Sequence, residues 1–101
     1  MKKFLFVVYG PPAENEQERA SGMELMAEWY RSLGSALVDP GAPFVAARTV
    51  SDSGIEDAIG PSATGYNMVE AASLDDALKL AQLCPLLQHG RSVTVFETLA
   101  M

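Results

Sequence analysis

Two side chains stand out as candidates for catalysis. His89 is the only histidine among the 101 residues, and histidine is the residue type that ordinarily gains or loses a proton near neutral pH, as a general acid or base must. Asp39 precedes Pro40-Gly41, where its carboxylate can form a turn with its own backbone or act as a functional acid. Asp39 and His89 are therefore the catalytic candidates.

Arg48 is the candidate for binding an anion. It alternates with Phe44 and Ala46, which places its charge on an otherwise apolar strand face, where a cation needs an anionic partner. That partner is either a carboxylate, such as Asp39 or Glu70, or a bound anion.

Aromatic side chains add a possible apolar lining. Small-molecule sites are mostly apolar with a few polar tips. Four aromatic residues could supply such a lining, although aromatic residues at helix or strand spacing also fill cores: Tyr9, Trp29, Tyr30 and Tyr66. We predict Arg48, Tyr66 and Trp29 as ligand-binding residues. Asp39, Arg48 and Tyr66 are expected to approach one cleft, with His89 a weaker member.

Composition narrows the function classes. The single cysteine, Cys84, allows neither an intrachain disulfide nor a cysteine-based zinc site, and we predict no metal or other cofactor. A net charge of −6 disfavours nucleic acid. No Walker loop, G-x-G-x-x-G, H-E-x-x-H or G-x-S-x-G motif occurs. No apolar run approaches the roughly 20 residues of a membrane span, and the lone cysteine favours the reducing cytoplasm.

The elements that must position these residues follow from the hydrophobic pattern. Residues 4–9 are apolar on both alternating faces, which is typical of a central strand. A helix is predicted from about Glu16, with Gly34 as its C-terminal cap. A second strand, kinked or split at Asp39-Pro40-Gly41, continues to Val50.

The second half of the chain repeats this order. Residues 51–65 are predicted to form a loop or a loosely paired hairpin tip, and 66–71 a third strand. Ser73 is expected to cap a second helix that Pro85 stops, and residues 92–98 to form a fourth strand.

The order βαββαβ in one domain, residues 1–101, predicts an α+β, ferredoxin-like fold: an antiparallel four-stranded sheet with two helices on one face. The apolar character of both faces of the first strand means that something must cover the second face. We expect a second copy of the sheet, in a homodimer. The pattern leaves open whether Phe6 or Val7 faces the partner.

Five segments together carry a resemblance to a known family: Met1 to Tyr9, Leu33 to Gly41, Gly65 to Ala77, Cys84-Pro85 and Gly90 to Val95. Over nearly the whole chain, this set resembles YCII-related proteins. The resemblance implies a dimeric α+β barrel, in which two sheets face each other. The Asp-Gly-Pro-Phe of many relatives is replaced by Ile59-Gly60-Pro61-Ser62, and the first-helix histidine of some relatives has no counterpart in residues 21–34. The chemistry suggested for those relatives is therefore not carried over.

Three functions remain open. The first is binding or transformation of a small molecule in a cleft of the dimer, so that the chain is an enzyme or a ligand binder. The second is a non-catalytic dimeric interaction or regulatory module. The third, degradation or isomerisation of an aromatic compound, rests on analogy between folds alone.

Overall fold

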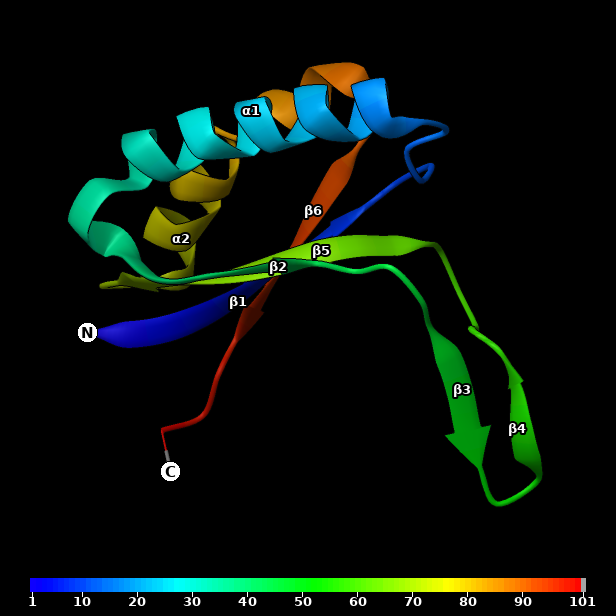
Figure 1. The fold of residues 1–101 in the computed structure, drawn as a ribbon. Helices are drawn as coiled ribbons and strands as arrows, with labels where there is room; N and C mark the ends of the chain where they lie inside the picture. Colours follow the sequence, from blue (N-terminus) through cyan, green and yellow to red (C-terminus); the bar gives the residue numbers. More distant parts are fainter. Residues whose placement is uncertain (101) are drawn as a thin grey trace.

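The computed structural model describes residues 1–100, and its main unit is a four-stranded sheet in the order β2-β5-β1-β6. Every neighbouring pair of strands is antiparallel, and both helices lie on one face (Figure 1). This confirms an α+β fold, and the strand order is compatible with a ferredoxin-like arrangement. The elements are β1 (Lys2–Tyr9), α1 (Glu16–Leu33), β2 (Leu37–Pro43), β3 (Arg48–Ser51), β4 (Gly54–Asp57), β5 (Ala63–Ala71), α2 (Leu74–Ala81) and β6 (Ser92–Glu97), with short 3-10 turns at Gly34–Ala36 and Pro85–His89.

Both helices begin at the side-chain caps that the sequence provides. Asn15 accepts a hydrogen bond from the backbone nitrogen of Glu18 at 2.8 Å, and Ser73 accepts one from Asp76 at 3.2 Å. Gly34 ends α1 with a positive φ of 56°, which glycine adopts without steric cost. Neither helix in the described part of the chain combines the length and apolar composition that crossing a membrane requires.

The two faces of β1 are now distinguished. Phe4, Phe6 and Val8 face the helices and are 0%, 0% and 1% exposed, whereas Leu5 and Val7 point to the opposite face and are partly buried. The core is completed mainly by Trp29, which stacks on Phe6 with ring centroids 5.6 Å apart. The Trp29 Nε1 donates to the carbonyl of Leu80 at 3.0 Å, so this side chain joins α1 to α2.

The second strand agrees with the sequence prediction in part. Register shifts lie on either side of Asp39, where a kink or split is predicted, but β2 stays paired with β5 as far as Pro43. Residues 44–50 do not continue it as one strand. Arg48 starts β3 instead, which pairs with β4 in a separate hairpin.

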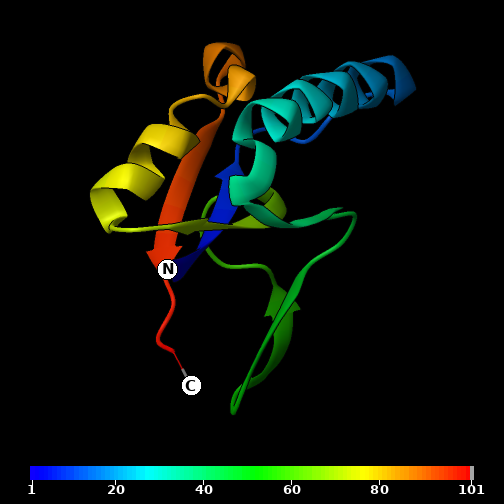
Figure 2. The same ribbon diagram turned by 90° about the vertical axis from the view of Figure 1, so that its left-hand side faces the viewer.

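The β3–β4 hairpin stands apart from the four-stranded sheet. It projects on the side away from the helices in both views (Figures 1 and 2). Its strands pair with each other, from Arg48 opposite Asp57 to Ser51 opposite Gly54. The segment predicted as a loop or hairpin tip is therefore an exposed hairpin on the same side as Leu5 and Val7.

Candidate functional site

A cleft of about 670 Å³ lies between α1 and the segment 40–47 that includes the end of β2. Its base is formed by Val8, Thr64 and Gly65, where β1 ends beside the start of β5. Ligand sites for small molecules commonly measure about 300–1,000 Å³. The cleft is therefore large enough for a small organic molecule.

One stripe along α1 forms a wall of this cleft. Arg19, Met23, Met26 and Tyr30 recur at steps of four, three and four residues, which places them on one helix face. At a rise of 1.5 Å per residue, the stripe from Arg19 to Tyr30 is about 16 Å long. Two flexible methionines lie between the polar ends, so the middle of this wall is apolar and adaptable.

Positive charge marks the end of the cleft near the start of α1. Arg19 and Arg91 both line it, and among residues 1–100 no carboxylate lies within ion-pair distance of either guanidinium. The stem of Arg91 packs against Gly10, where a Cβ would overlap it. The carboxylate in the lining, Glu18, accepts a hydrogen bond from the backbone nitrogen of Glu14 at 2.8 Å. The two arginines are thus free to bind an anion.

The other end of the stripe carries neutral polar groups. The Tyr30 hydroxyl donates to the carbonyl of Pro40 at 2.9 Å, and burial raises the pKa of that hydroxyl, although the neighbouring Asn67 lowers it in part. Asn67 is 0% exposed, and its Oδ1 and Nδ2 make no hydrogen bond to any residue from 1 to 100. Leaving such a buried polar group unpaired costs about 1–3 kcal/mol.

Close backbone packing fixes the opposite wall. Gly41 has a φ of 66°, and a Cβ there would overlap the carbonyl of Tyr66. Only glycine therefore fits at this point of the pairing between β2 and β5. Phe44 stacks on Tyr66 with ring centroids 5.7 Å apart and an interplanar angle of 17°. Both aromatic residues line the cleft.

Of the predicted binding residues, Tyr66 lines the cleft and the other two lie elsewhere. Arg48 is on the exposed hairpin, where its Nε donates to the carbonyl of Glu56 at 3.2 Å and lies 3.8 Å from Asp57 Oδ1. Its anionic partner is therefore neither Asp39 nor Glu70. Trp29 is fully buried in the core.

The two catalytic candidates also lie outside the cleft lining. Asp39 Oδ1 accepts a hydrogen bond from the backbone nitrogen of Gly41 at 2.8 Å, which is the turn-forming role of this residue type. His89 is an exposed residue of the 3-10 turn that precedes β6. The expected convergence of Asp39, Arg48 and Tyr66 on one cleft is not what the structure shows.

The sequence prediction missed Arg19, Arg91 and Asn67. Arg19 lies four residues before Met23 and continues the apolar stripe of α1 toward its first turn. Asn67 interrupts the helix-facing positions of β5 between Gly65 and Val69, a signal that was readable from the sequence. Arg91 follows a glycine outside any regular element, so nothing in its spacing indicated a site.

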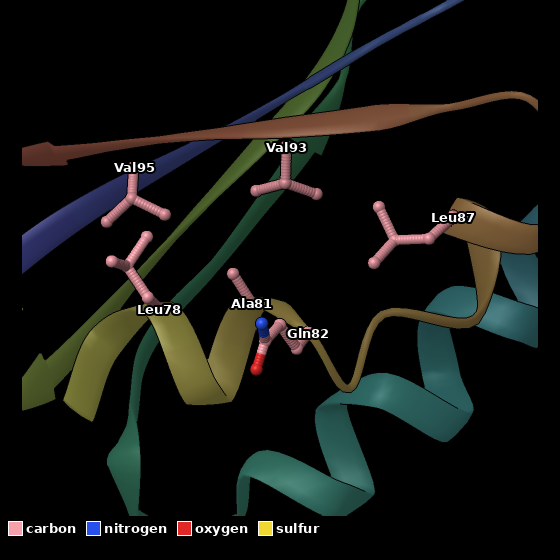
Figure 3. Close-up of a pocket in the computed structure, with 6 residues that line it drawn as sticks. All are labelled: Leu78, Ala81, Gln82, Leu87, Val93 and Val95. Atoms are coloured by element: carbon pink, nitrogen blue, oxygen red, sulfur yellow. The ribbon is translucent and has the colours of Figure 1, made fainter. Parts of the chain in front are cut away.

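A second, smaller groove of about 200 Å³ lies between α2 and β6 (Figure 3). Its side chains converge from the helix, from the turn after it and from the strand, and Gln82 is the polar member (Figure 3). The lining residues are Leu78, Ala81, Gln82, Leu87, Val93 and Val95. With no charged group in its lining, this groove is a weaker candidate than the cleft beside α1.

The proposal of a function has to start from the cleft, because neither a metal-binding group among the described residues nor a matching protein points to one. Within residues 1–100, no group of three or more His, Cys, Asp or Glu side chains could hold a metal ion. No family model matches the sequence, and no curated protein matches it either.

Proposed function

We propose that the protein binds a small molecule with an anionic group and an apolar body in the cleft beside α1. The observation that supports this proposal is that Arg19 and Arg91 line one end of a mostly apolar cleft and form no ion pair with any residue from 1 to 100. Guanidinium groups bind carboxylates and phosphates through paired hydrogen bonds. Met23, Met26 and Phe44 offer an apolar surface to the rest of the molecule.

The chemistry of the lining favours binding over acid–base turnover. Tyr30 has a raised pKa and its hydroxyl donates a hydrogen bond to the carbonyl of Pro40, and the Glu18 carboxylate accepts one from the backbone nitrogen of Glu14. A general acid or base must reach a reacting group and have a suitable pKa. Both side chains are instead held in hydrogen bonds to the backbone.

We further propose that two copies of the chain associate through the open face of the sheet, as the resemblance to YCII-related proteins implies. Leu5 lies between Met68 and Phe96 in the strand register, and Val7 lies beside Tyr66. Apart from Thr94, the other partner of Val7, these neighbours are apolar, and monomers rarely leave a large apolar patch uncovered. A two-fold axis would let each copy cover the other with the same surface.

The alternative function is a non-catalytic interaction module. The exposed β3–β4 hairpin supports it, because Val50 and Ile55 are directly opposite in the register and are 72% and 66% exposed. Such a hairpin could hold a second copy or another protein. The cleft would then have no ligand of its own.

Titration calorimetry with decanoate, an apolar chain bearing one carboxylate, tests the proposed binding. Arg91→Ala should weaken decanoate binding about tenfold or more, because a hydrogen bond to a charged group contributes about 1.5–3 kcal/mol. Arg48→Ala is the matched control, since Arg48 lies on the hairpin outside the cleft, and it should bind like the wild type.

Two results would contradict the proposal. One is the absence of decanoate binding by the folded wild-type protein. The other is equal weakening by Arg48→Ala and Arg91→Ala, which would mean that the anion does not bind in the cleft. The melting temperature of each variant separates lost binding from lost folding.

A further inference from the structure

Asn67 occupies a position where packing alone favours an apolar residue. On β5, the residues facing the helices are Gly65, Asn67, Val69 and Ala71, and the register partner of Asn67 on β1 is the fully buried Phe6. Neither polar atom of its side chain has a hydrogen-bond partner among residues 1–100. A buried amide without partners destabilises the fold, so its presence calls for an explanation other than packing.

The position of Asn67 relative to the cleft suggests one. Its amide lies beside Tyr30, although the two side chains do not reach the distance and angle of a hydrogen bond. Tyr30 lines the cleft at the end of the α1 stripe opposite Arg19, about 16 Å away along the helix. The cleft thus has a charged end and, at the far end of its apolar stretch, a neutral polar end.

We propose that Tyr30 and Asn67 recognise a second, neutral hydrogen-bonding group on the ligand of this cleft. This inference rests on the proposed function, because it names the class of molecule bound there. The ligand carries an anion at the arginine end, an apolar chain across Met23 and Met26, and a hydroxyl or a similar group at the other end.

A neutral group fits this end for two reasons. Asn67 offers one acceptor and two donor hydrogens, and a hydroxyl both donates and accepts. A second anionic group would lose its hydration there and face the carboxylate of Asp39, which itself helps to raise the pKa of Tyr30. Asn67 is fully buried and lies behind the lining rather than in it, so a ligand reaches it only if Tyr30, its neighbour in the lining, moves.

Two probes that differ by one hydroxyl test this inference. Calorimetry should show that the wild type binds 10-hydroxydecanoate about fivefold to tenfold more tightly than decanoate, the gain expected from hydrogen bonds to otherwise unpaired groups. Asn67→Leu, which has a similar volume, should lose this preference while retaining its affinity for decanoate. Its melting temperature should be unchanged or higher, because the unpaired amide is removed.

Further variants separate the failure of this inference from the failure of the proposed function. Arg91→Ala should weaken both probes by the same factor and leave their ratio unchanged. Tyr30→Phe should reduce the ratio of the affinities for 10-hydroxydecanoate and decanoate toward one. This variant tests the inference if Asn67→Leu does not fold.

Equal binding of the two probes by the wild type would overturn the role of Tyr30 and Asn67 and leave the proposed function standing. An unchanged preference in Asn67→Leu, or in Tyr30→Phe where the leucine variant does not fold, would also overturn it. If neither probe binds the wild type, both proposals are wrong.

Discussion

The two faces of the four-stranded sheet are built from the same strands but have different surroundings. On β1, Phe6 is 0% exposed beneath Trp29, whereas its neighbour Val7 lies on the face that no helix covers. Both residues are apolar, and each also has one polar cross-strand partner, Asn67 opposite Phe6 and Thr94 opposite Val7. The comparison shows that β1 is apolar on both alternating faces and that the helices of the subunit cover one of them.

The largest effect is expected from a charge on the helix-covered face. Phe6→Asp removes a buried aromatic ring, a loss that costs about 3–5 kcal/mol when the replacement is alanine, and it also buries a carboxylate without a partner. Since domains of this size are stable by about 5–15 kcal/mol, the variant should be largely unfolded. Far-ultraviolet circular dichroism checks this; a cooperative transition close to that of the wild type would contradict the assigned core.

Aspartate at the next residue, Val7, should weaken the association of two copies of the chain. Val7→Asp places a carboxylate on the open face, and a two-fold interface would bring the change in twice. Wild type should sediment at about twice the subunit mass of 10.8 kDa, and Val7→Asp should raise the dimer dissociation constant at least about a hundredfold, as for a buried unpaired charge.

Sedimentation at micromolar concentration also tests whether the open face of the sheet is covered by a second copy. A compact, stable wild-type monomer would contradict the homodimer. A Val7→Asp protein that remains a folded dimer would mean that association uses another surface, for which the exposed hairpin is the alternative.

The fold could be predicted from the sequence because its signals are local. The alternation in residues 4–9, Ser73 before the second helix and Gly34 after the first helix all act through near neighbours. The choice between Phe6 and Val7 could not be predicted, since both alternations are apolar and only the tertiary placement of the helices decides between them.

The candidate site was harder to predict because its members come together only in the folded chain. The sequence pattern places Arg48 on a strand segment that continues from Phe44 to Val50, but the chain leaves the sheet after Pro43 and forms the hairpin. Arg19 and Arg91 are 72 residues apart in the numbering, 91 − 19, and line the same cleft because α1 packs against the 3-10 turn Pro85–His89 that comes just before Arg91. No spacing rule links such residues.

Substitutions in the β3–β4 hairpin should have a smaller effect, and they test whether this hairpin forms the contact between two copies. Val50 and Ile55 are exposed, so the double change Val50→Ser and Ile55→Ser should alter subunit stability by less than about 1 kcal/mol, since surface substitutions usually fall within about 0.5 kcal/mol each. If the hairpin holds the second copy, the dimer dissociation constant should rise about tenfold.

Ile59→Ser is the matched control, because Ile59 is 72% exposed but lies outside the two paired strands. Equal weakening of the dimer by the control and by the double variant would show that the hairpin is not the contact.

The smallest expected effect is a loss of folding stability at alkaline pH, caused by Tyr30 and Cys84 on the helix-covered side of the sheet. Burial raises the pKa of Tyr30 above its ordinary 10.0 and that of Cys84 above 9.0, although backbone hydrogen bonds from Leu86 and Leu87 lower the latter in part. For each group the folded state holds the proton more tightly than the unfolded state does. Stability should therefore be unaffected by these groups below about pH 8 and decline as the pH rises through 9 and then 10.

Melting temperatures between pH 7 and 11 measure this decline, and two variants assign it. Cys84→Ala should remove the part that begins near pH 9, and Tyr30→Phe the part that begins near pH 10. Because both side chains lie on the covered side, Val7→Asp should leave the shape of this decline unchanged even where it lowers the melting temperature at every pH. A decline that persists unaltered in both variants would show that other groups cause it.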